Sequence, residues 1–562
     1  MKDYLVHELH AVLAAQDAVP ADFEAEFETP NNPDHGDLST NAAMKLARYL
    51  RKAPRQIASD LQAALEARLD PTRVSAVEVA GPGFINFRFA DHYLTTQLAD
   101  LLAQGLRYGR SDVGAGQTAL VEYVSANPTG PLTVGHGRNA VLGDTMANVL
   151  DWLGYDVTRE YYFNNAGRQM RVLGHSVRAR YEALVHPDGP TKTISTDNGD
   201  LEVPASFPDD GYQGDYIADI AQALYDEQGA ALMASADEGP FKQAAEQTIF
   251  ADIDATMQRL GIQMDTYFNE DDLYRSNKIW DVLDALRADG HIYDQDGAVW
   301  FKTTAFGKEK DTVLVKSTGE PTYRLPDIAY HANKFERGFA RVVDVFGADH
   351  IATYPDVLKG VELLGHDPAQ VDVIIYQFVT LVRGGELVKM STRKATYVTL
   401  DELMDEVSED VTRFFFLMRS PNTHLEFDLD LAREASDKNP VFYLQYAHAR
   451  ICAILRKAEE VGFRFDHEAD LALLTHEAEQ ALMKELFRFP AVLQRAADVQ
   501  GPHVISTYLR EVAVAFTQFY GACRIVGEET ALATARMRLA EATRLVLRNG
   551  LTVLGISAPE RM

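Results

Sequence analysis

The sequence has little cysteine, no long apolar run and no excess of positive charge. Its two cysteines, Cys452 and Cys523, form no metal-ligand spacing and predict no disulfide framework. No uninterrupted apolar stretch is long enough to span a bilayer. The first ten residues lack the basic region and apolar run of a signal peptide. These absences predict a cytoplasmic protein with no membrane partner and no metal site of its own.

Other common signatures are also missing. We find no P-loop, no dinucleotide glycine fingerprint and no internal repeat. The formal net charge is -29, whereas a nucleic-acid-binding protein usually shows a basic footprint. From Pro440 to Met562, however, 14 Lys and Arg balance 14 Asp and Glu, so all the excess acid lies upstream. Composition alone therefore does not indicate an RNA partner.

The chain is 562 residues long, which predicts several domains. Residues 1–112 have helical patterns at 42–50 and 54–69, and strand patterns at 74–79 and 84–89, which predict a small α+β domain. For residues 113–430 we expect an α/β fold, a doubly wound parallel nucleotide-binding core with an insertion near 187–300. Apolar strands at 341–346 and 371–378, separated by a helix at 354–364, belong to this core.

The last part of the chain, residues 431–562, is expected to be an all-α helical bundle. Its long helical candidates are residues 441–461, 478–497, 504–524 and 530–549. Upstream, the polar and acidic stretch 191–211 has no apolar period, which favours a surface insertion or hairpin.

One stretch of the core has the order strand, loop, helix. Residues 119–124 predict a buried strand, the segment from Asn127 to Pro131 predicts a turn, and Gly135 and His136 fall where a helix begins. A helix start beside the end of a parallel strand favours phosphate, and Gly135 lets a ligand approach the backbone. The alternative is a strand–helix corner with a satisfied histidine.

A second polar stretch lies about 250 residues later. Lys389, Ser391, Arg393 and Lys394 follow a turn at 383–386 and precede a predicted helix at 400–407. Three cations around a small hydroxyl can clamp a polyphosphate. A solvated basic loop is the alternative.

Together the two stretches resemble the signature motifs of class I aminoacyl-tRNA synthetases, usually His-Ile-Gly-His and Lys-Met-Ser-Lys. Thr133 stands for the first His and Thr392 for the second Lys. Five further segments resemble bacterial-type arginyl-tRNA synthetases in the family's order: residues 30–41, 80–87, 321–330, 440–450 and 559–562.

The resemblance implies an arginine–tRNA ligase that activates L-arginine with ATP to arginyl-adenylate. The arginyl group then passes to the 3′-terminal adenosine of tRNA(Arg). The implied partners are tRNA(Arg), L-arginine and ATP, with Mg²⁺ entering on ATP, and a monomer is expected. Neither step needs a protein nucleophile, so catalysis is positioning and electrostatic stabilisation.

The resemblance also implies four groups of site residues. The catalytic residues are His136, Lys389, Ser391, Arg393 and Lys394. ATP is expected to meet Thr133, Gly135, His136, Asp349, His350 and Met390. Arginine is expected to meet Glu122, Ser125, Asn127, Tyr323 and Asp327. The tRNA is expected to meet Phe84 and Asn86 at an exposed turn, and Tyr446, Arg450 and Met562 near the anticodon.

Several of these residues have plain structural alternatives. Asp327 could be a helix-start charge, Tyr323 and Tyr446 core aromatics, and Asp349 and His350 surface polars at a strand end. Two rival functions also remain at this stage. One is a paralogue that adenylates a small carboxylate without tRNA, and the other is a tRNA-binding protein without catalysis.

Overall fold

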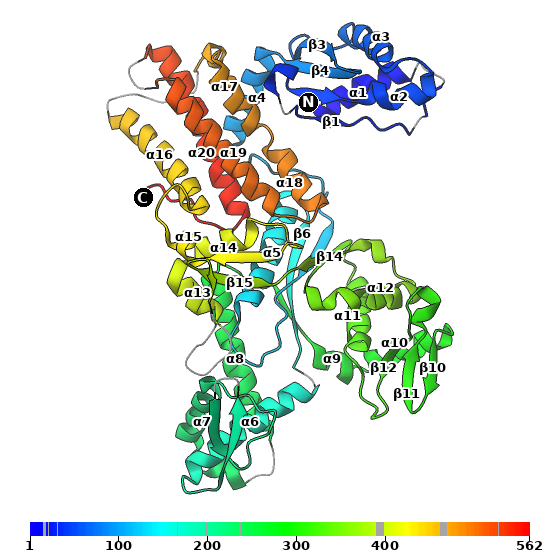
Figure 1. The fold of residues 1–562 in the computed structure, drawn as a ribbon, viewed down its shortest axis with the longest axis vertical. Coiled ribbons are helices and arrows are strands. Elements are labelled where there is room, and N and C mark those ends of the chain that lie inside the picture. Colours follow the sequence, from blue (N-terminus) through cyan, green and yellow to red (C-terminus); the bar gives the residue numbers. More distant parts are fainter. Residues whose placement is uncertain are drawn as a thin grey trace.

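The computed structural model describes residues 1–14, 18–20, 22–30, 32–165, 167–196, 199–234, 238–388, 398–460, 469–525 and 528–562. Figure 1 shows an N-terminal domain and a helical bundle at one end of the molecule, with a central sheet below them and two further lobes beyond it. No helix in the described part of the chain is long and apolar enough to cross a membrane.

The N-terminal domain is an antiparallel sheet covered by helices, as predicted. Its strands β1 (Phe27–Glu28), β2 (Leu38–Thr40), β3 (Val74–Ala80) and β4 (Phe84–Phe89) have the order β1-β2-β4-β3. Helices α1 (Lys2–Leu13), α2 (Ala42–Leu50) and α3 (Pro54–Glu66) complete it. Their apolar residues form a separate core that ends at Phe87. The next helix, α4 (Asp91–Gln104), contributes its leucines to the main core instead.

The central sheet is parallel and has the order β14-β13-β5-β6-β9. The strands are β5 (Thr118–Glu122), β6 (Asp156–Phe163), β9 (Thr266–Asn269), β13 (Arg341–Gly347) and β14 (Val371–Tyr376). The chain builds outward from β5 on one side and from β13 on the other, which is the doubly wound arrangement that was predicted. The carboxyl ends of β5 and β13 therefore form a topological switch point, where such sheets bind ligands.

Helices on the two faces of this sheet contact alternate residues at the end of β5. Glu122 bonds to Lys334 of α11 (Arg324–Glu336), while Tyr123 packs against α5 (Val134–Trp152). The approach of Tyr123 requires glycine at position 143, because a Cβ there would lie 2.2 Å from the Tyr123 Cβ.

One lobe of the molecule follows β6. It contains α6 (Gly167–Val185), a hairpin of β7 (Thr191–Thr196) and β8 (Gly199–Pro204), and helices α7 (Asp215–Gln228) and α8 (Gly239–Arg259). The hairpin confirms one of the two interpretations of the polar stretch 191–211. After α8 the chain returns to the central sheet through β9, so the predicted insertion near 187–300 includes one core strand.

The other lobe leads from β9 back to β13. It contains α9 (Glu270–Arg275), α10 (Lys278–Ala288) and a sheet of β10 (Ile292–Gln295), β11 (Ala298–Phe301) and β12 (Thr312–Val315), and it ends with α11. The helix predicted at 354–364 is α12 (Tyr354–Leu363), between β13 and β14.

Beyond β14, a small sheet of β15 (Val379–Arg383), β16 (Glu386–Leu387) and β17 (Leu425–Asp428) carries α13 (Leu400–Val407), α14 (Glu409–Leu417) and α15 (Leu429–Arg433). The bundle follows, with α16 (Pro440–Glu460), α17 (Glu477–Leu486), α18 (Phe489–Asp498), α19 (His503–Ala522) and α20 (Thr530–Val553). The single helix predicted at 478–497 is wrong. It is two helices, because Pro490 lacks an N–H and lies in the first turn of α18.

A buried arginine joins the bundle to the core. The Arg413 guanidinium, on α14, donates to Asp144 of α5 and to the carbonyl oxygens of Leu260 and Leu554, at 2.5, 2.8 and 3.0 Å. Asn148 of α5 donates to the Val553 carbonyl at 3.1 Å. The last carbonyls of α20, which have no partner within their own helix, are thus capped by the core.

Candidate active site

The first turn of α5 forms one wall of the site. Thr133 is the N-cap, and its backbone N–H donates to His136 Nδ1 at 3.2 Å. Because Nδ1 accepts, the proton of a neutral His136 lies on Nε2. Burial lowers the pKa of His136, which keeps the ring neutral near pH 7. A Cβ at Gly135 would meet only the Thr133 hydroxyl, at 3.7 Å, so the backbone is open to a ligand there.

The chain after the predicted phosphate loop lies against this same turn. Lys389, Met390, Ser391, Thr392, Arg393 and Lys394 lie outside the described residues. The segment after them pairs with the segment before α5: Thr399 forms a β-bridge with Thr133, and Leu400 N–H donates to the Leu132 carbonyl at 2.8 Å. The described segment that follows the second motif therefore lies beside the first motif at the start of α5.

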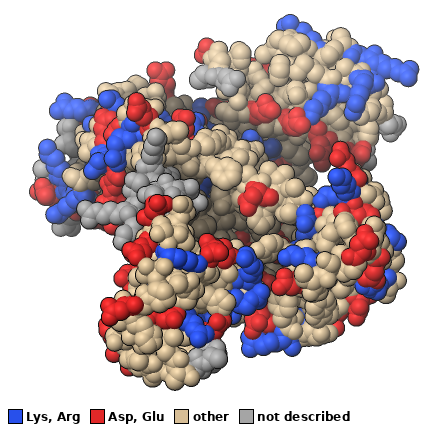
Figure 2. Space-filling view, turned by 60° about the horizontal axis from the view of Figure 1, so that its bottom comes forward, with Lys and Arg blue, Asp and Glu red and all other residues tan. Residues whose placement is uncertain are grey.

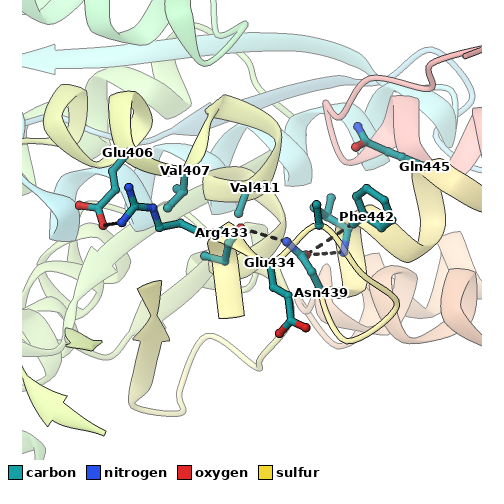
Figure 3. Close-up of a pocket in the computed structure, with 11 residues that line it drawn as sticks. Glu406, Val407, Val411, Arg433, Glu434, Asn439, Phe442 and Gln445 are labelled. Carbon is teal, nitrogen blue, oxygen red and sulfur yellow. Dashed lines mark hydrogen bonds and ion pairs between the residues drawn. The ribbon is translucent and has the colours of Figure 1, made fainter. Parts of the chain in front are cut away.

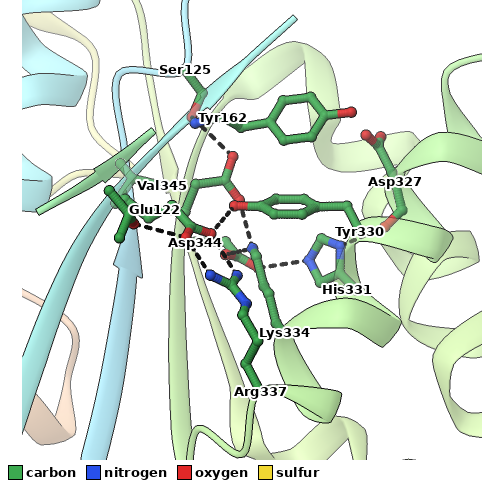
Figure 4. A network of polar contacts seen from close by, with 12 residues as sticks. Glu122, Ser125, Tyr162, Asp327, Tyr330, His331, Lys334, Arg337, Asp344 and Val345 are labelled. Carbon is green, nitrogen blue, oxygen red and sulfur yellow. Dashed lines mark hydrogen bonds and ion pairs between the residues drawn. The ribbon is translucent and has the colours of Figure 1, made fainter. Parts of the chain in front are cut away.

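A buried ion network fills the switch point between β5 and β13 (Figure 4). Lys334 Nζ donates to Glu122 and to Asp344, at 2.6 Å in each case, and all three side chains are almost completely buried. Burial alone would lower the pKa of Lys334, but Asp344 and Glu122 raise it above its usual value. Glu122 also accepts from Ser125 Oγ at 2.9 Å. Both carboxylate oxygens of Glu122 thus have partners.

His331 also contacts this network. Its Nε2 lies 2.8 Å from Asp344 Oδ2 and its Nδ1 lies 2.8 Å from the Asp327 backbone carbonyl. Burial alone would raise the pKa of Asp344, but Lys334 and His331 hold it below its usual value.

Beside this network, two carboxyl groups form no ion pair within the described part of the chain. Asp327, in the first turn of α11, points toward Tyr162 in Figure 4, and burial raises its pKa to about 6. Burial, and next the charge of Asp327, raise the pKa of Glu270 to about 7. Asp327 also lines a small pocket with His331, Phe346, His350 and Tyr354. A cation placed between Asp327 and Glu270 would lower both pKa values.

Sequence reasoning missed Glu270 and Lys334. Glu270 begins α9 directly after β9, so it lies at the carboxyl end of a core strand. That position would have indicated it, had β9 been assigned to the sheet rather than to an insertion. Lys334 gave no such signal, because its partner Glu122 is 212 residues away.

The other predicted substrate residues lie around this centre. Tyr323, the N-cap of α11, is 70% exposed, so the core-aromatic alternative is wrong for it. Asn127 is exposed, and its Nδ2 donates to Gln169 Oε1 at 2.9 Å. Asp349 and His350 follow β13, and the His350 ring stacks on Phe346 at 5.1 Å.

The predicted RNA contacts divide into exposed and buried residues. Phe84 is 40% exposed, but Asn86 is only 4% exposed and accepts from Ser39 Oγ at 2.7 Å. The expectation of an exposed Asn86 is therefore wrong, because it lies in the interior of β4 and not in the turn. In the bundle, Tyr446 is 47% and Met562 57% exposed, which excludes the core alternative for Tyr446. The Arg450 guanidinium lies 4.4 Å from the Tyr520 ring centre.

Charged side chains of both signs are spread over the surface. Figure 2 shows acidic side chains over much of the visible face and one group of basic side chains at the outer end of the N-terminal domain. The exposed cations of α2, α3 and the turn between them are Arg48, Arg51, Lys52 and Arg55.

A separate groove of about 310 Å³ lies where α13–α15 meet α16 (Figure 3). Val407, Val411 and Val441 contribute apolar surface, and the Arg433–Glu406 ion pair lies on its edge. None of the substrate residues named above lines it.

Comparison with known proteins assigns each part of the chain. Family models match the arginyl tRNA synthetase N terminal domain at residues 1–89, the class I (R) tRNA synthetase catalytic domain at 97–418 and the DALR anticodon binding domain at 444–562. The chain is 65% identical over 563 residues to an arginine–tRNA ligase of Salinibacter ruber, covering 100% of both. It is 49% identical to that of Desulfotalea psychrophila, covering 95% of this chain and 94% of the relative. Its fold resembles Thermus thermophilus arginyl-tRNA synthetase, with a TM-score of 0.75, 22% identity and 100% of both chains covered.

Proposed function

The chain belongs to the arginyl-tRNA synthetases, ATP-dependent ligases that join arginine to tRNA. We propose that its reaction centre lies between the start of α5 and the start of α11. The single observation that carries this proposal is the pair of carboxyl groups, Asp327 and Glu270, which have raised pKa values, form no ion pair among the described residues and lie at the sheet edge where α/β folds bind ligands. Arginine supplies the cation that this pair lacks.

ATP is proposed to lie at the N-terminus of α5. Neutral His136 donates from Nε2 to a phosphate oxygen, and the open backbone at Gly135 lets the nucleotide approach. Lys389, Ser391 and either Arg393 or Lys394 are proposed to cover the phosphates, with Thr133, Met390, Asp349 and His350 completing the nucleotide site. We propose that Mg²⁺ enters bound to the phosphates of ATP, as it does in sites without a dedicated protein cage.

Arginine is proposed to direct its guanidinium toward Asp327 and Glu270. A planar guanidinium forms bidentate hydrogen bonds to carboxylates, which a lysine ammonium does not. Tyr323 lies one turn before Asp327, and Asn127 and Ser125 lie at the end of β5. A carboxylate has about four acceptor positions, so Glu122 can accept from arginine while it holds Lys334.

The remaining proposals concern the tRNA and the assembly. Phe84 is proposed to stack on an unpaired base of the tRNA, and Tyr446, Arg450 and Met562 to contact the anticodon loop, since exposed aromatics and arginine suit single-stranded RNA. We also propose that the protein is a cytoplasmic monomer. Sedimentation at micromolar concentration tests the monomer, and a dimer mass would refute it.

The decisive experiment is arginine-dependent ATP–pyrophosphate exchange, measured with and without tRNA(Arg). We expect exchange with arginine and not with lysine, and only when tRNA is present. Exchange that is equal for lysine and arginine would refute the proposed carboxylate site.

Alanine at Arg393 or at Lys394 should lower kcat and kcat/KM together if that cation replaces the one that Thr392 lacks. Normal rates in both variants would show that Lys389 alone supplies the positive charge at the ATP phosphates.

A further inference from the structure

The connection between β5 and α5 is held by side chains from outside it. Asn139 Oδ1 accepts from Val124 N–H at 2.6 Å, and the Tyr161 hydroxyl donates to the Ala126 carbonyl at 2.6 Å. Gln169 of α6 binds Asn127. The connection thus reaches α5 with contacts from several separate elements.

Its first residues need this support. Val124 and Ser125 have φ values of 64° and 42°, in the left-handed region that non-glycine residues rarely adopt. For a β-branched residue such as Val124 this conformation is strained, and it persists only where surrounding contacts impose it. The path of the following residues therefore depends on those contacts.

Two tyrosines from the lobe after β6 hold the middle of the connection. The Tyr216 hydroxyl, in the first turn of α7, donates to the Thr129 carbonyl at 2.5 Å. The Tyr212 side chain lies beside the Thr129 side chain. The next residue, Gly130, packs against Tyr216, because a Cβ at this position would come within 3.1 Å of the Tyr216 hydroxyl oxygen.

The lobe that supplies these tyrosines is firmly attached to the core. Ile217, Ile220 and Ala221 of α7 belong to the main hydrophobic core. Tyr212 N–H donates to Ser176 Oγ of α6 at 3.0 Å. Burial raises the pKa of Tyr216 well above its usual range, so its hydroxyl remains a donor at every working pH. A fixed donor on a fixed helix is suited to holding a loop in one conformation.

We infer that Tyr216 is a positioning residue for the reaction: by fixing Thr129 and Gly130 from outside the central sheet, it places Asn127 for substrate arginine. This inference rests on the proposed role of Asn127. The lobe after β6 is therefore part of the active site, although none of its side chains needs to touch the reacting atoms.

The test compares three single variants of the full-length enzyme. Tyr216→Phe removes only the hydroxyl and keeps the ring against Gly130. Tyr225→Phe makes the same change on the same helix, where the ring packs edge-on against Tyr181. Asn127→Ala tests the residue through which Tyr216 is proposed to act. For each variant, kcat, the KM values for arginine and ATP, and the midpoint of thermal unfolding are measured.

For Tyr216→Phe we expect KM for arginine to rise about 3- to 10-fold, the range of one lost hydrogen bond. The kcat, the KM for ATP and the unfolding midpoint should remain close to those of the parent and of Tyr225→Phe. A KM for arginine within twofold of the parent refutes the inference if Asn127→Ala raises it. If Asn127→Ala leaves it unchanged as well, the proposed role of Asn127 is what fails. Equal losses in Tyr216→Phe and Tyr225→Phe would show a general effect on the lobe and would also overturn the inference.

Discussion

Replacing Asp327 by asparagine removes one negative charge from the proposed guanidinium site with almost no change in shape. The pKa of Asp327 is about 6, so at pH 7.5 the native carboxyl is ionised and its full charge is lost in the variant. A hydrogen bond to a charged group contributes about 1.5–3 kcal/mol, which corresponds to roughly a 10- to 150-fold fall in kcat/KM for arginine. The KM for ATP should change little, because ATP is proposed to lie at the start of α5.

The assay is aminoacylation of tRNA(Arg) with arginine varied at saturating ATP, and then the reverse. Asp284→Asn is the matched control, since it makes the same change at an exposed position of α10, the helix next to α11. An unchanged kcat/KM for arginine in Asp327→Asn would remove this residue from the site. A parallel loss for both substrates with a lower unfolding midpoint would show that Asp327 supports the fold and not recognition.

Three further predictions follow from the same geometry. The pKa values of Asp327 and Glu270 are about 6 and 7, and arginine binding needs both carboxyl groups ionised. The KM for arginine should therefore fall roughly 20-fold from pH 6 to pH 8. A KM that does not change over that range would refute the proposal that these two carboxylates bind arginine. Lys334→Met leaves two buried carboxylates without their cation and should destabilise the core by about 3–5 kcal/mol, measured by urea unfolding. Lys438→Met, which breaks the exposed pair with Glu434 at 3.4 Å, should cost less than about 1 kcal/mol, and equal losses in the two variants would contradict this account. His136→Ala should lower kcat for activation roughly 10²- to 10³-fold while tRNA binding, followed by filter retention, stays intact; an unfolded variant would restore the satisfied-histidine alternative.

Local patterns predicted most of the fold because their causes are local. The helix at the Gly135–His136 motif begins at Val134, and the strands predicted at 74–79 and 84–89 pair as a hairpin. Pro490 shows the limit of such patterns. Apolar periodicity continues across it, so one helix was expected, but the missing N–H divides α17 from α18.

The site was less predictable because its contacts are distant in sequence. Asp327 was predicted from its motif, but the charged groups around it come from β5, α9, the segment after β13 and later turns of α11. The sequence around Lys334 is that of an ordinary surface lysine, because its partner Glu122 lies 212 residues away and meets it only in the folded sheet. The expectation that Asn86 is exposed was wrong for a local reason instead. It follows the turn by only a few residues, but it lies within β4 between β2 and β3, opposite Ser39 and Glu78, and these neighbouring strands cover its side chain.

Arg413 caps α20, so the N-terminal domain and the C-terminal bundle differ in how far each can be removed without disturbing the catalytic domain. The N-terminal domain meets the bundle through Lys484 and Asp37, an ion pair whose ammonium is 33% exposed and can exchange its partner for water. Deleting the bundle would instead remove the Leu554 carbonyl from a guanidinium that is 1% exposed, and would strip the Val553 carbonyl from Asn148 of the catalytic helix. A minimal arginine-activating fragment should therefore be sought by trimming from the N-terminal side, with the C-terminal helix retained as part of the catalytic fold.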